Sequence, residues 1–96
     1  MPPAKVPRMT FEAEIRVLLK PSVNDPQGLS ILGALHALGF DDVESVRAGK
    51  VFQLRLTAPD RAAAKAAIDD MCARLLANPV IEHYAFSLAE ATAPVP

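Results

Sequence analysis

Apolar and polar side chains alternate along residues 11–20, with an apolar residue at every second position from Phe11 to Leu19. A period of two is typical of a strand that buries one of its faces. The same alternation returns in two later segments, at Phe52, Leu54 and Leu56 and at Tyr84, Phe86 and Leu88. We therefore predict strands in these three places. Val43–Ala48 forms a fourth, joined to the strand over 51–57 at Gly49-Lys50.

Helical spacing of apolar residues appears twice. The first stripe comprises Gly28, Ile31, Leu32, Leu35 and Leu38. Asp25 supplies an N-cap oxygen before Pro26, and Gly39 ends the helix by accepting a left-handed conformation. The second helix starts at Pro59-Asp60, stops at Asn78-Pro79, and carries the stripe Ala64, Ile68, Met71 and Leu75. We expect one face of the first helix to pack on a sheet.

The predicted order of elements is βαββαβ. A ferredoxin-like two-layer sandwich of the α+β class accommodates it, with one antiparallel sheet and both helices on one face. The outer sheet face would then carry Arg16, Leu18, Gln53, Arg55, His83, Ala85 and Ser87, a mixture that suits pairing with another copy or another protein. Proline-rich ends suggest a flexible extension over 1–10, a single domain over 11–90 and a flexible tail over 91–96.

Composition narrows the function classes. The chain has 96 residues, 51% of them apolar, and a net charge of −1, which gives no electrostatic basis for nucleic-acid binding. Its one cysteine, Cys72, cannot form an internal disulfide. We see no signal-peptide pattern and no apolar run of the roughly 20 residues that a membrane span needs. These features predict a cytoplasmic protein that binds neither nucleic acid nor membrane.

The sequence contains few residues in arrangements that suit catalysis. His36 and His83 have no Cys, Asp or Glu at a metal-ligand spacing, so we predict no metal site. Cys72 lies on the core-facing side of the second predicted helix, where a free cysteine acts as a small hydrophobe rather than a nucleophile. We therefore predict no catalytic residue and no cofactor site in this chain.

Charges around a glycine form the clearest candidate contact site. Arg47 and Lys50 flank Gly49 at the predicted strand junction, where the backbone can come close to a partner. A guanidinium offers a planar fork for carboxylates. We predict that these residues contact a larger subunit, while solvated hairpin charges are the plainer interpretation.

Several segments resemble one family in order and without a large gap from about Phe11 to Leu88. They are Leu18-Leu19-Lys20, Asp25-Pro26-Gln27-Gly28, Ala34-Leu35-His36, Leu38-Gly39-Phe40, Val46-Arg47-Ala48-Gly49-Lys50 and the specific block Met71 to Glu82. This pattern is similar to PurS, the small subunit of multi-subunit phosphoribosylformylglycinamidine synthase in purine biosynthesis. Asn78, inside the specific block, joins Arg47, Gly49 and Lys50 as a candidate interface residue.

The resemblance implies a complex that uses ATP and glutamine to convert formylglycinamide ribonucleotide to formylglycinamidine ribonucleotide. In such a complex a glutaminase subunit releases ammonia and a large synthetase subunit, which binds ATP and Mg, consumes it. The small subunit would form a homodimer or higher oligomer, bridge the two and assist ammonia transfer, with no cofactor of its own.

Two other function classes fit the size and the strand order. A ferredoxin-like regulatory module could bind a small molecule at a dimer interface. An acylphosphatase-like enzyme would need a glycine-rich, arginine-bearing turn after the first strand, and the segment Lys20-Pro21-Ser22-Val23-Asn24 is not one. The assembly subunit is therefore the prediction, and the sensing module is its alternative.

Overall fold

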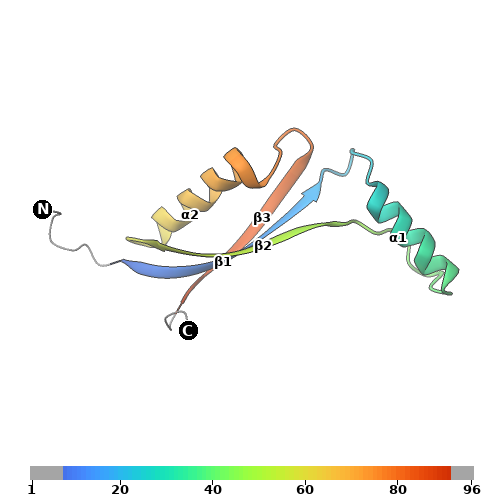
Figure 1. Ribbon diagram of the computed structural model, residues 1–96, viewed down its shortest axis with the longest axis horizontal. Helices are drawn as coiled ribbons and strands as arrows, with labels where there is room; N and C mark the ends of the chain where they lie inside the picture. The colour runs from blue at the N-terminus through green and yellow to red at the C-terminus, as the bar shows by residue number, and fades with distance from the viewer. Residues whose placement is uncertain (1–7, 92–96) are drawn as a thin grey trace, which may run out of the picture.

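A three-stranded antiparallel sheet forms the centre of the protein. The computed structural model describes residues 8–91. It contains, in chain order, β1 (Met9–Leu19), α1 (Pro26–Ala37), β2 (Gly49–Ala58), α2 (Arg61–Met71), a π-helical turn η1 (Cys72–Leu76) and β3 (Glu82–Glu90). The strands lie in the order β2-β1-β3. Figure 1 shows α2 against the sheet and α1 beyond one end of it. The predicted α+β, ferredoxin-like class is confirmed.

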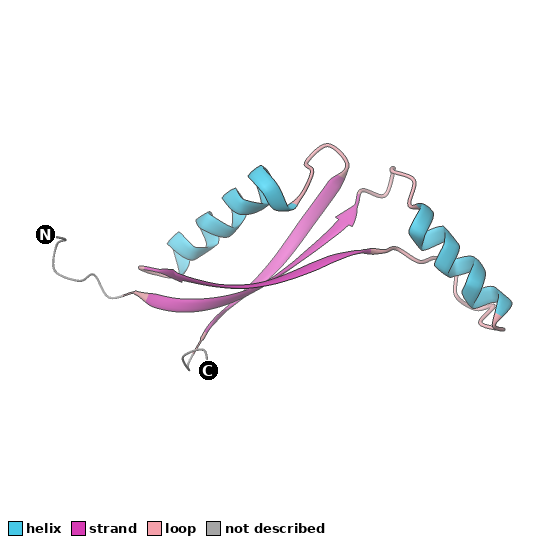
Figure 2. Cartoon of the chain, viewed as in Figure 1, coloured by secondary structure: helices cyan, strands magenta, loops and turns pink. Residues whose placement is uncertain are grey.

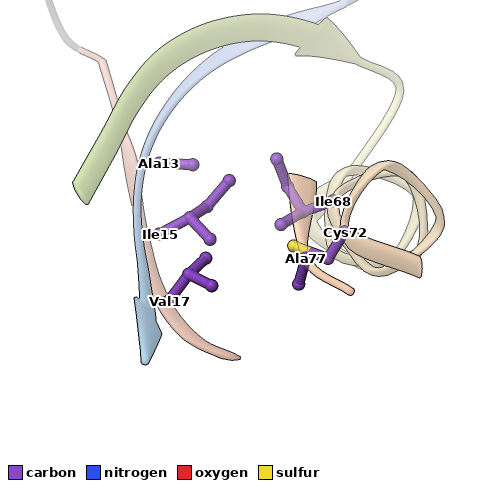
Figure 3. Packing of buried hydrophobic residues seen from close by; sticks show 6 residues of the cluster. All are labelled: Ala13, Ile15, Val17, Ile68, Cys72 and Ala77. Atoms are coloured by element: carbon purple, nitrogen blue, oxygen red, sulfur yellow. The ribbon is translucent and has the colours of Figure 1, made fainter. Parts of the chain in front are cut away.

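The buried side chains follow the predicted alternation. Every second residue of β1 points toward α2, and Phe11, Ala13, Ile15 and Val17 are all almost fully buried. Figure 3 shows three of them facing Ile68, Cys72 and Ala77 across the layer. β1 is buried most completely because it is the central strand and pairs with a neighbour along both edges. The core is therefore built on β1, with α2 and η1 as its cover.

Strand β1 begins earlier than predicted. Met9 and Thr10 pair with Ala58 and Thr57, so the strand includes two residues that we assigned to the flexible extension. At the other end, the Ala91 amide donates to Thr10 O at 2.8 Å. The remainder of both predicted tails, 1–7 and 92–96, lies outside the described residues.

The predicted strand over Val43–Ala48 and the turn at Gly49-Lys50 are wrong for a single chain. Residues 43–48 have no strand partner within the described residues, and the chain passes into β2 without reversing direction (Figure 2). Two interactions hold it this way. Asp25 accepts a hydrogen bond from the Ala48 amide at 2.9 Å, and Gly49 is already paired with Leu18 of β1.

The position of α1 also differs from the prediction. Its caps are as expected: Asp25 accepts from the Gly28 amide at 3.0 Å, Pro26 is the first helical residue, and Gly39 has φ +99°. However, α1 lies beyond the end of the sheet rather than on its face (Figure 1). The helix contacts residues 43–48 of its own chain instead: Gly28 closely approaches Val46 O, and His36 Nε2 lies 2.7 Å from Val43 O. Ile31 and Leu38 of the predicted stripe are exposed.

The last turn of the second helix changes the stripe that we predicted. Ala77 donates to Cys72 O at 3.0 Å, a bond from residue i to i−5 that widens the turn into a π-helix. The wider turn rotates the following residues. Cys72 takes the inward position, whereas Leu75, which we placed in the stripe, is 83% exposed.

Candidate subunit-contact surface

One end of the sheet gathers most of the predicted interface residues. β1 ends there, β2 starts with Gly49, and the loop after η1 returns the chain to β3. The Lys20 amide donates to Ile81 O at 2.8 Å, which ties the exit of β1 to the entry of β3. We call this region, residues 18–20, 49–51 and 78–83, the junction end.

Glu82 organises the junction end, and the sequence analysis did not single it out. One of its carboxylate oxygens lies 3.7 Å from Lys50 Nζ. The other accepts the Asn78 amide at 2.7 Å. Glu82 thus joins two of the predicted interface residues, which are distant in sequence. Glu82 is the last residue of the block Met71 to Glu82, which was the one sequence feature that pointed to it. The spacing of Glu82 from Lys50 does not predict their contact.

The loop that carries Asn78 is a compact turn. Asn78 Oδ1 accepts the Val80 amide at 3.0 Å, and Asn78 O accepts the Glu82 amide at 2.7 Å. These bonds occupy the Asn78 side-chain oxygen within its own loop. Asn78 therefore shapes the junction end, and the neighbouring apolar side chains Val80 and Ile81, which are exposed, present its contact area.

Lys50 and Gly49 hold fixed positions in the sheet. Lys50 Nζ lies 5.9 Å from the centre of the Phe52 ring, within the range of a cation–π contact. A side chain at Gly49 would collide with Val17 O and with the Leu18 side chain. The glycine is required because β2 approaches β1 closely, and not because the chain turns there.

Arg47 lies apart from this cluster, on the segment that returns from α1. It is exposed, and its charge acts on Asp25. Hydrogen bonds from Ala48 and Gly28, followed in size by the Arg47 charge, hold the pKa of Asp25 below its ordinary value. An ionised Asp25 thereby joins the first residues of α1 to the residues that enter β2.

The other titratable residues considered in the sequence analysis, His36, His83 and Cys72, either make contacts within the fold or lie on its surface. His36 Nε2 lies 2.7 Å from Val43 O, and His83 is exposed. Cys72 is fully buried, and burial, with a smaller effect of Asp69, raises the pKa of its thiol. Tyr84 donates to Asp69 at 3.0 Å, which raises the pKa of Tyr84 and links β3 to α2.

Polar side chains line a hollow on the outer sheet face. It has a volume of about 500 Å³ and is bounded by residues of all three strands, among them Glu12, Glu14, Gln53, Arg55 and Ser87. Arg55 and Glu12 form an ion pair there at 3.0 Å. Within residues 8–91 no three His, Cys, Asp or Glu side chains are placed to hold a metal ion. No helix in the same range is long and apolar enough to span a bilayer.

Comparisons with known proteins agree on one family. The family model described as "PurS: Phosphoribosylformylglycinamidine (FGAM) synthase" matches residues 12–90. The PurS subunit of Synechocystis is 47% identical over 79 residues, which are 82% of this chain and 79% of that protein.

Solved structures give the same result. PurS of Thermus thermophilus has a TM-score of 0.77 at 40% identity, covering 85% of this chain and 98% of the other. A chain of the structure named "PurLQS from Thermotoga maritima" has a TM-score of 0.75 at 30% identity, covering 85% and 98%. Since the family match spans nearly all described residues, the protein belongs to the PurS family of phosphoribosylformylglycinamidine synthase subunits.

Proposed function

We propose that this chain is the assembly subunit of a cytoplasmic phosphoribosylformylglycinamidine synthase. It bridges a glutaminase subunit, which releases ammonia from glutamine, and a large synthetase subunit, which binds ATP and Mg and consumes the ammonia. The chain itself carries no active site and binds no cofactor. It associates with copies of itself, and the resulting homo-oligomer assists the transfer of ammonia between the larger subunits.

The observation that carries this proposal is the junction end. Lys50, Glu82 and Asn78 form a connected group with fixed geometry, beside the exposed apolar side chains Val80 and Ile81. A rim of ordered charges around exposed apolar residues is the usual anatomy of a protein interface. The buried, raised-pKa Cys72 and the separated histidines supply no comparable catalytic group.

Charge reversal at the predicted contact residues tests the proposal. The double variant Arg47→Glu, Lys50→Glu should weaken co-purification with the synthetase and glutaminase subunits. Glutamine-dependent synthesis should fall at least tenfold, because loss of one partner of a buried interfacial charge pair costs about 2–5 kcal/mol. Synthesis supplied with free ammonia should change much less, since free ammonia bypasses transfer between subunits.

Lys65→Glu is the matched control, because Lys65 is exposed on α2. Its neighbour Ala64 packs with Phe11 and Ala58, at the end of the sheet opposite to the junction end. It should leave both rates unchanged. The thermal midpoint of each variant shows whether the chain still folds. A folded double variant with normal assembly and a normal glutamine-dependent rate would contradict the proposed contact. It would mean that Arg47 and Lys50 are solvated surface charges.

A further inference from the structure

Strand β3 has an open edge along its whole length. In the sheet order β2-β1-β3 it pairs with β1, and no strand of residues 8–91 lies on its other side. The pairing with β1 runs from Glu82 to Glu90 without a bulge. Proteins usually protect such an edge with lysines, prolines or bulges, and residues 82–90 contain none of these. This edge is therefore available to a further strand.

The direction of the backbone groups shows which residues of β3 face the open edge. The ladder to β1 continues past both ends of β3 through bonds of 2.8 Å that involve Ile81 O and the Ala91 amide. Successive residues of a strand direct their backbone groups to alternate sides, so the odd-numbered residues of β3 bond to β1 and the even-numbered residues face away from it. Both the N–H and the C=O of Tyr84 and Phe86 therefore point to the open edge.

Contacts at the two ends limit the open stretch. Arg61 Nη2 donates to Leu88 O at 2.6 Å and occupies one acceptor of the edge. The Glu82 amide donates to Asn78 O at 2.7 Å. Both contacts involve even-numbered residues of β3, in agreement with the direction assigned to their backbone groups. A strand that binds here would pair with residues 83–87, between these two contacts.

A mainly apolar pocket lies beside the start of this stretch. It has a volume of about 360 Å³, and its apolar lining comes from Cys72, Ala73, Ala77, Pro79 and the Tyr84 ring. Among the described residues none of β1 or β2 lines it, so the pocket lies on the β3 side of the sheet. Its polar lining residues, like Pro79, belong to the junction end. The pocket and the open edge thus adjoin the proposed contact surface.

The charge beside the pocket favours a basic occupant. Asp69 accepts a hydrogen bond from the neutral Tyr84 hydroxyl at 3.0 Å, and within residues 8–91 it forms no ion pair. The hydrogen bond to Asp69 raises the pKa of Tyr84, and the same carboxylate adds to the effect of burial in raising the pKa of the Cys72 thiol. The negative charge of Asp69 therefore acts on the pocket lining, where a lysine or arginine of a bound segment would complement it.

We infer that this edge of β3 binds an extended segment of one of the larger synthase subunits. The segment adds a strand beside residues 83–87, places one apolar side chain in the pocket and carries a lysine or arginine next to Asp69. In strand addition of this kind the main-chain bonds give affinity, and pockets for alternate side chains give specificity. The inference rests on the proposed assembly role and names the surface and the kind of segment that carry it.

Other occupants of the edge fit less well. If β3 of a second copy paired antiparallel here, its inward side chains Phe86 and Leu88 would lie over the pocket, but both pack in the core of their own copy. The pocket would then stay empty. The ends of the chain are also unsuited, because residues 1–7 contain three prolines, residues 92–96 contain two, and proline cannot donate to a strand ladder.

Hydrogen exchange of the full-length chain, with and without purified synthetase and glutaminase subunits, tests the inference. In the chain alone the Tyr84 and Phe86 amides should exchange rapidly, whereas the Ala85 amide, which faces β1, should be protected. In the complex Tyr84 and Phe86 should exchange at least tenfold more slowly. Slow exchange of both amides in the chain alone would mean that a second copy covers the edge, and would overturn the inference.

The same measurement separates this inference from the proposed function. A complex in which Tyr84 and Phe86 still exchange rapidly overturns strand addition and leaves the assembly role in place. A chain that binds neither larger subunit overturns both.

A change in the backbone makes the test specific to the edge. Cys72 is the one cysteine of the chain, so a synthetic peptide of residues 72–96 can be ligated to residues 1–71 with no change in sequence. N-methylation of Phe86 removes one donor from the edge and keeps both the side chain and the ladder to β1. It should raise the Kd for the larger subunits at least tenfold. N-methylation of Leu88, beside the Arg61 contact, is the matched control and should leave the Kd unchanged.

Two side-chain variants test the pocket. Ala73→Phe places a ring at the pocket lining and should raise the Kd at least tenfold, whereas Ala62→Phe, also at an exposed alanine but in the first turn of α2, should not. Asp69→Asn keeps an oxygen for the Tyr84 hydroxyl and removes the charge, so binding should weaken and depend less on salt. The thermal midpoint of each variant shows that it folds. Equal Kd values for folded Ala73→Phe and Ala62→Phe would overturn the docking of a segment in the pocket.

Discussion

Two glycines of α1 occupy opposite environments, and this difference gives a paired prediction. A methyl group at Gly28 would collide with Val46 O and with the Asp25 carboxylate, whereas nothing lies within 4 Å of the same position at Gly33. Residues 24–48, which comprise α1 and the segment that returns to β2, are called the arm here. Gly28→Ala should therefore loosen the arm and accelerate proteolysis between residues 24 and 48. Gly33→Ala should slow proteolysis there, because alanine favours a helix over glycine by about 1 kcal/mol. Equal cleavage rates for the two variants would contradict the packing of Val46 on α1.

Asp25 should make the arm sensitive to acid. Its pKa is lowered by the hydrogen bonds from Ala48 and Gly28, so its contribution to stability is present above the ordinary aspartate pKa of about 3.9. That contribution is lost as the pH falls through the lower pKa of the folded chain. Asp25→Asn keeps a side-chain oxygen but does not titrate. Between about pH 4 and pH 2 the wild-type thermal midpoint should fall further than that of Asp25→Asn. Parallel curves would show that Asp25 does not hold the arm.

Cys72 should behave as a core residue and not as a reactive thiol. Its side chain is fully buried, and burial raises its pKa, so little thiolate is present near neutral pH. A thiol reagent should label the native chain slowly and the urea-unfolded chain at once. Cys72→Ala should cost about 1–2 kcal/mol of stability and leave the activity of the assembled complex intact. Total loss of activity in a stable, assembled variant would reverse this assignment.

At the scale of elements, local sequence signals were reliable where the contacts are local. The capping of α1 by Asp25, the left-handed Gly39 and the alternation of β1 all depend on neighbours a few residues away, and all three are confirmed. The π-turn at Cys72–Leu76 was not predicted, because its stripe of apolar residues also fits a regular helix. Glu82 was missed because its contact with Lys50 exists only after β2 and β3 flank β1.

The π-turn leads to a prediction that separates two apolar residues of one predicted stripe. Ile68→Ala should destabilise the protein by about 2–5 kcal/mol, because Ile68 is fully buried against β1. Leu75→Ala should change stability by less than about 0.5 kcal/mol, because the wider turn leaves Leu75 exposed. Urea unfolding of both variants measures the difference. A large loss of stability in Leu75→Ala alone would mean that Leu75 is covered in the folded protein.

At the scale of the whole molecule, the sequence predicted a complete two-layer sandwich that one chain does not form alone. The prediction of four strands included Val43–Ala48 although the spacing of Val43 and Val46 breaks strict alternation. An apolar pattern of this kind does not say whether the segment finds a neighbouring strand. The structure keeps that segment in the arm, where Asp25 and α1 hold it. Chain connectivity therefore explains the two largest departures, the missing edge strand and the displaced α1, by a single cause.

The arm's two sides should affect the assembly of copies differently. Leu29 and Leu38 are both exposed, at 59% and 73%, and they are nine residues apart, so they point in opposite directions from the helix. If the proposed self-association covers the side that carries Ile31 and Leu38, Leu38→Asp buries a charge in the interface, whereas Leu29→Asp leaves one in water. Light scattering at micromolar concentration should then give a monomer mass for Leu38→Asp and a dimer or larger mass for Leu29→Asp and wild type. The helical content of all three, followed by circular dichroism, should be the same. A well-folded Leu38→Asp that keeps the wild-type mass would place this side of α1 in solvent and remove the apolar basis for self-association through the arm.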